Sequence, residues 1–160
     1  MLLHLPQMLT PQEVAQAREW MSDEVLWLDG RSTAGIQALS QKNNRQLAQG
    51  TEVSKRLQAL VLQALQRDAL FFSAALPKRI LPPLFNRYGG DSNFYGQHVD
   101  GAVLKVPTTG EWLRTDVSCT VFLSDPADYD GGELMVQDTY GRRGVKLAAG
   151  DAVLYPGTSV

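Results

Sequence analysis

His98 and Asp100 stand two residues apart within a predicted strand, Phe94–Asp100. Side chains at positions i and i+2 of a strand share one face, about 6.6 Å apart along the chain, which is close enough to bind one metal ion. An imidazole and a carboxylate are two members of the two-His, one-carboxylate triad that binds non-haem Fe(II) and leaves positions open for other ligands. Alone the pair is a weak signal, because a surface histidine beside an aspartate turn has the same sequence.

Other reactive side chains favour simpler interpretations. Cys119 lies in an apolar run without a neighbouring base, so a buried small hydrophobic residue is favoured over a nucleophile. The glycines of the segment Asp130–Glu133 favour a tight turn that enters a strand over an acidic metal site. The candidate chemistry therefore concentrates on His98 and Asp100.

The half of the chain that carries this pair is predicted to form short strands. Residues that favour β-structure alternate there with turn signals such as Gly89-Gly90-Asp91. The candidate strands are Ile80–Tyr88, Phe94–Asp100, Asp116–Leu123, Gly132–Gln137, Arg143–Leu147 and Ala152–Tyr155. Strands joined by such short turns favour antiparallel pairing.

Two helices are predicted before these strands. Thr10–Glu13 reads as a capping box with proline in the first turn, so a helix should run from there to about Ser22. Apolar residues recur at helical spacing from Glu52 to Leu70 and predict a longer amphipathic helix. Between the helices, Val25–Leu28 is short enough to be a strand, and residues 31–50 are predicted as a loop with at most a short strand.

This order of elements favours the α+β class, with N-terminal helices packed on an antiparallel double-stranded β-helix, or jelly-roll. A length of 160 residues favours one structural domain. Residues 1–78 would form its helical part and residues 79–160 the jelly-roll core. Because the sequence stops at Val160, directly after a predicted strand, we expect the jelly-roll to be incomplete at the C-terminus.

The composition excludes several classes of protein. With 44% hydrophobic and 20% charged residues the chain can bury a core, and a net charge of −2 argues against nucleic acid or an anionic membrane as a partner. No apolar run is long enough to span a membrane, and no secretory signal or internal disulfide is expected from the N-terminus or the single cysteine. The cytoplasm is the expected compartment, and the sequence leaves a homo-oligomer open.

Four segments carry a resemblance to a known family: Leu84–Tyr88, His98–Ala102, Arg114–Ser124 and Tyr129–Leu134. They resemble the Fe(II)- and 2-oxoglutarate-dependent dioxygenases of the prolyl-4-hydroxylase type, and more narrowly the bacterial PKHD-type hydroxylases, a group linked to iron uptake. The resemblance runs through nearly the whole chain.

The resemblance implies roles for several residues. His98 and Asp100 would bind Fe(II), and Tyr88 would lie beside 2-oxoglutarate, although a core tyrosine with a satisfied hydroxyl is an equal alternative. Ser118 and Thr120 could line the same pocket, but filling the packed face of their strand is favoured. Phe122 stands where many prolyl hydroxylases carry a hydrogen-bonding tyrosine, and its ring cannot donate to a carboxylate.

Part of the family's site is missing from the sequence. The family's third ligand is a second histidine, and an arginine about one strand later holds the 2-oxoglutarate carboxylate. The other histidine, His4, precedes the first helix and is interpreted as a surface or strand residue. We therefore expect the distal histidine and the arginine beyond Val160, and weak iron binding by the 160-residue chain as it stands.

The function that the resemblance implies is hydroxylation of an unactivated C–H bond, with decarboxylation of 2-oxoglutarate to succinate and with O2 as oxidant. Ascorbate is the reductant commonly associated with the family. The substrate, a small molecule or a peptide, is not identified by the sequence. Two other classes stay open: a cupin-like metal enzyme of different chemistry, and a non-catalytic binding domain that keeps the fold.

Overall fold

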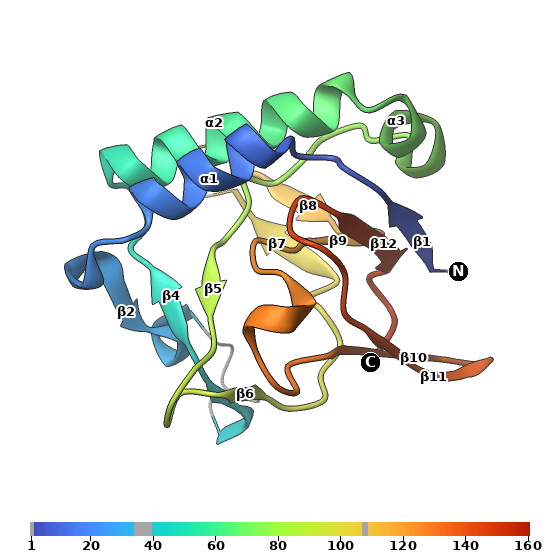
Figure 1. The fold of residues 1–160 in the computed structure, drawn as a ribbon. Helices are drawn as coiled ribbons and strands as arrows, with labels where there is room; N and C mark the ends of the chain where they lie inside the picture. The colour runs from blue at the N-terminus through green and yellow to red at the C-terminus, as the bar shows by residue number, and fades with distance from the viewer. Residues whose placement is uncertain (1, 34–39, 107–108) are drawn as a thin grey trace.

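The two ends of the chain meet in one antiparallel sheet, in the order β1–β12–β9 (Figure 1). The computed structural model describes residues 2–33, 40–106 and 109–160. In this sheet β1 (Leu3–Leu5) and β9 (Val117–Val121) flank β12 (Ala152–Pro156). The apolar residues of β12 are buried on both faces of the sheet, which is why a strand this short can lie in the interior.

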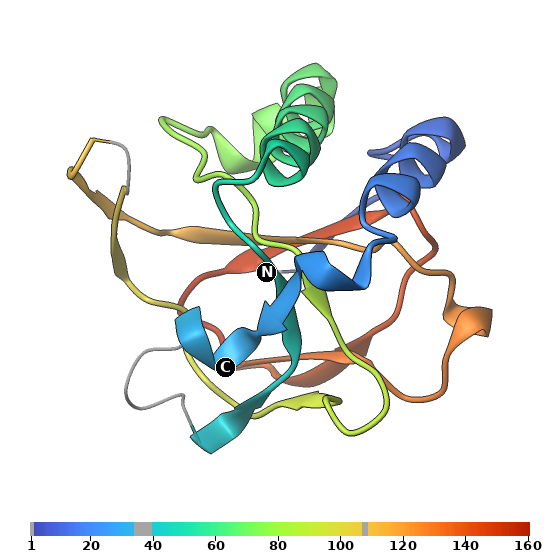
Figure 2. The same ribbon diagram turned by 90° about the vertical axis from the view of Figure 1, so that its left-hand side faces the viewer.

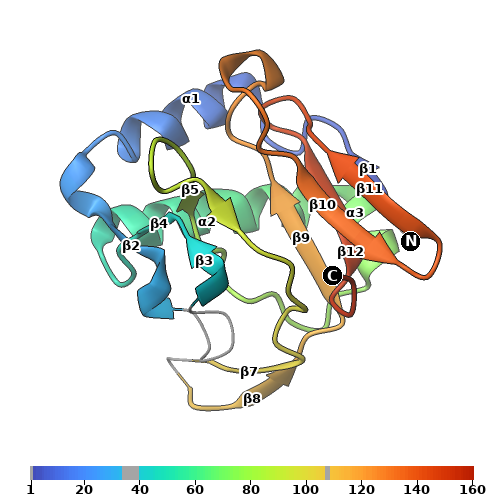
Figure 3. The ribbon, with the colours of Figure 1, turned by 90° about the horizontal axis from the view of Figure 1, so that it is seen from below.

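The other strands form small antiparallel sheets around this one. A sheet in the order β2–β4–β5 and the pairs β3–β6, β7–β8 and β10–β11 complete the β-structure of the described chain. Their bounds are β2 (Trp27–Asp29), β3 (Lys42–Asn43), β4 (Arg45–Leu47), β5 (Asn86–Arg87), β6 (Phe94–Tyr95), β7 (Val103–Lys105), β8 (Trp112–Arg114), β10 (Leu134–Asp138) and β11 (Gly141–Val145). The hairpin β10–β11 lies beside the C-terminus (Figure 3), where the backbone N–H of Val160 donates to the carbonyl of Gln137 at 3.0 Å.

The first predicted helix is confirmed as α1 (Pro11–Trp20), which ends about two residues before the predicted Ser22. Its capping box is present, because the Thr10 hydroxyl accepts from the Glu13 N–H at 3.2 Å and the Glu13 carboxylate accepts from the Thr10 N–H at 2.8 Å. Local sequence therefore fixed the start of this helix.

The second predicted helix is divided into α2 (Glu52–Arg67) and α3 (Ala69–Ala75). Asp68 adopts an extended conformation between them, and its carboxylate accepts from the Phe71 N–H at 2.7 Å. The side chain thus caps a new helix, and it interrupts the helix that the apolar spacing predicted to continue to Leu70.

The helices cover one face of the sheets (Figures 1 and 2). Leu154 of β12 and Leu5 of β1 belong to the same buried cluster as Leu57 and Val61 of α2. On the opposite face, Val153 packs with Phe122 and Val145. The sheet β1–β12–β9 therefore has an outer face, toward the helices, and an inner face, which carries Val153. Successive side chains of β9 point alternately to these two faces.

Several sequence predictions differ from this structure. The predicted strand Ile80–Tyr88 is reduced to β5, because Pro82 and Pro83 supply no N–H for a strand ladder. The predicted strand Phe94–Asp100 is reduced to β6, since the chain turns away after Tyr95, where the N–H of Gly96 donates to the carbonyl of Gln41 at 2.6 Å.

The predicted division into a helical part, residues 1–78, and a sheet core, residues 79–160, also differs from the structure. The first part contributes β1, β2, β3 and β4, each paired with other strands of the chain. Of the predicted loop 31–50, residues 34–39 lie outside the described residues, and the remainder contains two short strands. What stands is a mixed fold of helices and antiparallel sheet.

Candidate active site

His98 and Asp100 face each other from an irregular segment that follows β6, with His98 Nε2 at 3.5 Å from Asp100 Oδ1. The sequence placed them on one strand face, and the structure brings them together without a strand. Their side chains are 32% and 41% exposed, so the pair is open to solvent on one side. An imidazole nitrogen and a carboxylate oxygen at this separation can share a cation.

The His98 ring is held in place on two sides. Its Nδ1 lies 2.8 Å from the Gly96 carbonyl, which can only accept, so Nδ1 carries the proton. The Tyr95 ring stacks on the imidazole, with the ring centroids 3.8 Å apart. In the neutral ring Nε2 is then the free ligand atom, and it points toward Asp100. Metal-binding histidines commonly use such a bond from their other nitrogen to fix the tautomer.

Asp100 is oriented by a neighbouring strand. The Ser118 hydroxyl on β9 donates to Oδ2 of Asp100, which leaves Oδ1 directed at His98. When His98 is protonated at both ring nitrogens, the contact between Nε2 and Oδ1 holds the pKa of Asp100 below its ordinary value, although burial opposes this shift. The same contact raises the pKa of His98. The sequence favoured a packing role for Ser118, and the structure instead has it orient Asp100.

These donors fit a divalent metal ion. Bonds of about 2.1 Å to nitrogen and oxygen, the value for zinc, put ligand atoms that meet at a right angle about 3 Å apart. The observed 3.5 Å between His98 Nε2 and Asp100 Oδ1 is close to that separation. Both ligands have a hydrogen-bonding partner behind them. Within the described ranges, however, no group of three or more His, Cys, Asp or Glu side chains could hold a metal ion.

A buried lysine and two tyrosines lie around the pair. The Lys42 side chain, on β3, lies over the Tyr95 ring with Nζ 5.2 Å from the centroid, and burial lowers its pKa. Tyr88 follows β5 with its ring partly exposed, and burial raises the pKa of its hydroxyl, an effect that a hydrogen bond with Asn44 offsets in part. The hydroxyls of Tyr155 on β12 and Thr120 on β9 lie 3.2 Å apart, diagonally across the paired strands.

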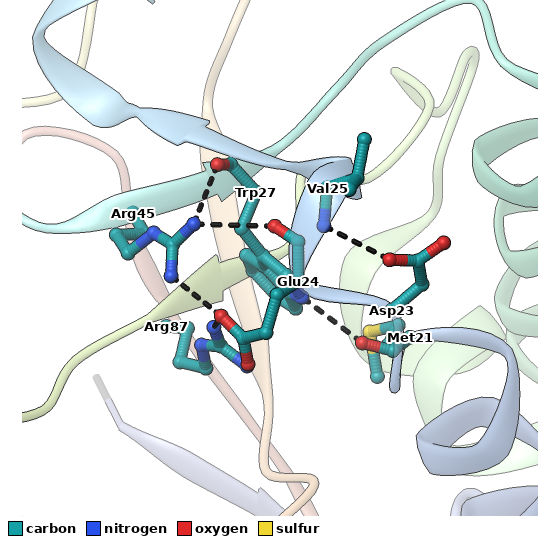
Figure 4. Close-up of polar contacts among 7 residues, drawn as sticks. All are labelled: Met21, Asp23, Glu24, Val25, Trp27, Arg45 and Arg87. Atoms are coloured by element: carbon teal, nitrogen blue, oxygen red, sulfur yellow. Dashed lines mark hydrogen bonds and ion pairs between the residues drawn. The ribbon is translucent and has the colours of Figure 1, made fainter.

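The sheet behind Tyr88 is held by an ion cluster, Arg45, Glu24 and Arg87 (Figure 4). Glu24 accepts from Arg45 at 2.7 Å and from Arg87 at 2.5 Å, and these bonds hold its pKa below the ordinary value. The Arg87 guanidinium stacks over the Trp27 ring at 4.5 Å. A surface pocket of about 210 Å³ adjoins Tyr88 here, lined by the two arginines, Gly89 and Ser92. It does not include His98 or Asp100, so it is separate from the metal ligands.

The remaining sequence candidates lie elsewhere. His4 belongs to β1, as a strand residue, and its Nε2 lies 2.7 Å from Asp151 Oδ2. Cys119 lies on the edge strand β9 and is exposed, so the expectation of a buried residue is wrong. Neighbouring atoms still desolvate the thiol enough to raise its pKa to about 12, which leaves it protonated and a poor nucleophile at neutral pH.

Sequence reasoning missed that Tyr95 stacks on His98 and that Ser118 donates to Asp100. The sequence did indicate that the side chains of Ser118 and Thr120 share one face of their strand, because they alternate with Cys119. The contact with Asp100 was not readable, because it joins segments 18 residues apart.

Comparison with known protein families shows that residues 83–160 match the 2OG-Fe(II) oxygenase superfamily. A PKHD-type hydroxylase of Variovorax paradoxus is 56% identical over 160 residues, which cover 100% of this chain and 70% of that protein. PKHD-type hydroxylases of Verminephrobacter eiseniae and Caulobacter vibrioides are 54% and 52% identical, again over 100% of this chain and 70% of theirs. The family match includes the segment that holds His98, Asp100 and Ser118.

Proposed function

The chain belongs to the PKHD-type hydroxylases of the 2OG-Fe(II) oxygenase superfamily, and from this premise we propose that His98 and Asp100 bind the Fe(II) with which it hydroxylates a C–H bond. The family implies an oxygenase that uses Fe(II), 2-oxoglutarate and O2. One observation carries the residue assignment: His98 Nε2 faces Asp100 Oδ1 at 3.5 Å, and the remaining polar atom of each side chain is already bound by the protein.

Fe(II) with 2-oxoglutarate and O2 supplies the oxidation of the C–H bond, and we propose that the co-product is succinate. The protein's own residues bind and orient. The carbonyl of Gly96 holds the proton of His98 on Nδ1, so that Nε2 stays available as a ligand. The Ser118 hydroxyl keeps Asp100 from rotating, and the Tyr95 ring shields one face of the imidazole from water. Preorganised ligands of this kind avoid reorganisation when the metal binds.

The finer features of the family are further parts of the proposal. The sheets of this chain would form part of a jelly-roll, and a distal histidine and an arginine after Val160 would complete the binding of iron and 2-oxoglutarate. Tyr88 would lie beside the cosubstrate, and its partly buried hydroxyl supports this role.

The biological setting is also proposed. The enzyme would act in the cytoplasm on a small molecule or peptide linked to iron uptake, with ascorbate as reductant and without nucleic acid or membrane partners. Within the described part of the chain, no helix has the length and apolar character needed to cross a membrane.

The test is 2-oxoglutarate-dependent turnover by the full-length protein with Fe(II), measured as succinate formed and O2 consumed. His98→Gln should reduce turnover more than about 100-fold, beyond the 10–100-fold cost typical of residues behind the ligands. The matched control is His4→Gln, because His4 pairs with Asp151 rather than with the proposed ligands. Turnover that survives His98→Gln would contradict the assignment.

A further inference from the structure

Two arginines lie side by side on the sheet β2–β4–β5. Arg45 of β4 is directly opposite Arg87 of β5 in the antiparallel register, where like charges repel each other. Glu24 supplies one carboxylate for both guanidinium groups, which lie beside it in Figure 4. Asp29, opposite Arg45 on β2, is itself bound by Arg31. Three guanidinium groups against two carboxylates leave this cluster with an excess positive charge.

Arg87 keeps several donors available for a ligand. A guanidinium carries five N–H groups, and in the described part of the chain Arg87 donates one hydrogen bond, to Glu24 at 2.5 Å. Arg45, in contrast, also donates to the backbone carbonyls of Glu24 and Trp27. The Arg87 guanidinium stacks over the Trp27 ring at 4.5 Å, which fixes its plane. Because the Arg87 side chain is 36% exposed, a ligand in solvent can reach its remaining donors.

These donors adjoin the surface pocket of about 210 Å³, which we call the arginine pocket: Arg45, Arg87, Tyr88, Gly89 and Ser92. All five lining residues are neutral or basic. Two backbone hydrogen bonds of 3.0 Å join Gly89 and Ser92 and fix the turn that carries them. The Ser92 hydroxyl has no hydrogen-bond partner among the described residues, so it can donate into the pocket. An anion in the pocket would therefore meet donors from both the sheet and the turn.

We propose that the arginine pocket binds a small anionic group, a carboxylate or a phosphate, through hydrogen bonds from Arg87 and the Ser92 hydroxyl. The planar fork of a guanidinium suits both groups, because two of its N–H donors can bind two oxygens at once. The bound anion neutralises the excess positive charge of the cluster. A pocket of about 210 Å³ holds one such group, since sites for drug-sized ligands measure about 300–1,000 Å³. The inference is independent of the proposed function, because His98 and Asp100 lie outside this pocket.

The experiment is NMR titration of inorganic phosphate and, separately, of acetate into the isotope-labelled full-length protein without metal, at constant ionic strength. The backbone N–H signals of Gly89 and Ser92 and the Nε–H signal of Arg87 should shift and saturate with at least one of these anions. Tighter binding of phosphate would identify a phosphate site, and tighter binding of acetate a carboxylate site. Either preference supports the inference.

Two substitutions remove the proposed donors one at a time. Arg87→Gln should weaken anion binding by about tenfold or more, the range for a hydrogen bond to a charged group. Ser92→Ala should weaken it by a few-fold and leaves the ion cluster intact, so it tests the pocket even if Arg87→Gln disturbs the sheet. The matched control is Arg56→Gln, because Arg56 is an exposed residue of α2.

The titrations can also overturn the inference. Signals of Gly89 and Ser92 that do not shift with either anion would do so, as would equal anion affinity in the wild type, Arg87→Gln and Ser92→Ala. His98→Gln separates this pocket from the proposed metal ligands, and it should bind the anions as the wild type does. Loss of anion binding in His98→Gln would place the anion at the proposed metal site, which would overturn the inference and leave the proposed function standing.

Discussion

Replacing Ser118 with alanine tests whether the site is held ready for a metal. The substitution removes the hydroxyl that donates to Asp100 Oδ2 and leaves the strand β9 otherwise unchanged. A hydrogen bond to a charged group contributes about 1.5–3 kcal/mol, and the 41% exposure of the Asp100 side chain favours the lower end. About 1.5 kcal/mol corresponds to about a tenfold loss of metal affinity. This agrees with the 10–100-fold range for residues behind metal ligands.

The assay is calorimetric titration of Mn(II) into the full-length Ser118→Ala protein. Ser73→Ala is the control, because Ser73 is an exposed residue of α3 whose hydroxyl bonds only to the local carbonyl of Leu70. Circular dichroism and thermal unfolding establish that both variants are folded. Wild-type affinity in a folded Ser118→Ala protein would refute the reasoning that Ser118 orients Asp100 for the metal.

Three other substitutions test the ring stack, the N-terminal helix and the core. Tyr95→Leu removes the ring stacked on His98 at 3.8 Å and should weaken Mn(II) binding by a few-fold to about tenfold, since such aromatic pairs contribute about 0.5–1.5 kcal/mol. In the wild-type protein the ion pair with Arg67 lowers the pKa of Glu13 to about 2. Glu13→Gln keeps an oxygen that can accept the cap hydrogen bond but loses this ion pair. Because this folded-state pKa is below its ordinary value, the stabilisation of about 0.5–1 kcal/mol is present near pH 7 and is lost as the pH falls from about 4.5 toward 2. Denaturant unfolding at pH 7 and at pH 2 measures the free energy of unfolding of the variant and of the wild type. If the variant is as much less stable than the wild type at pH 2 as at pH 7, the ion pair with Arg67 is not the source of the stabilisation. Leu154→Ala should cost about 2–5 kcal/mol of unfolding free energy, because Leu154 is 1% exposed between the sheet and the helices. A loss below 1 kcal/mol would show that this core is loosely packed.

The elements that the sequence predicted well depend on contacts between near neighbours. The capping box at Thr10 and the apolar stripe of α2 involve residues three or four positions apart, which a periodic pattern reveals. The helix break at Asp68 was missed because the apolar stripe continues past it, although an aspartate that can cap the next helix is itself a local signal.

The candidate site was predicted only in part for the same physical reason. His98 and Asp100 are close in sequence, and their residue types suggest a metal. Part of their support comes from a distant segment, because Ser118 is 18 residues from Asp100. No local pattern encodes this contact, which joins the strand β9 to the irregular segment that follows β6.

The most direct test of the central claim is equilibrium binding of Fe(II) to the full-length protein under anaerobic conditions, with Asp100→Asn compared with Asp116→Asn. Asp116 is a matched control, because it is exposed and pairs with Arg114. We expect Asp100→Asn to lose Fe(II) affinity by about 100-fold or more while Asp116→Asn binds as the wild type does. Undiminished Fe(II) binding in a folded Asp100→Asn protein would contradict the assignment of His98 and Asp100 as the metal ligands.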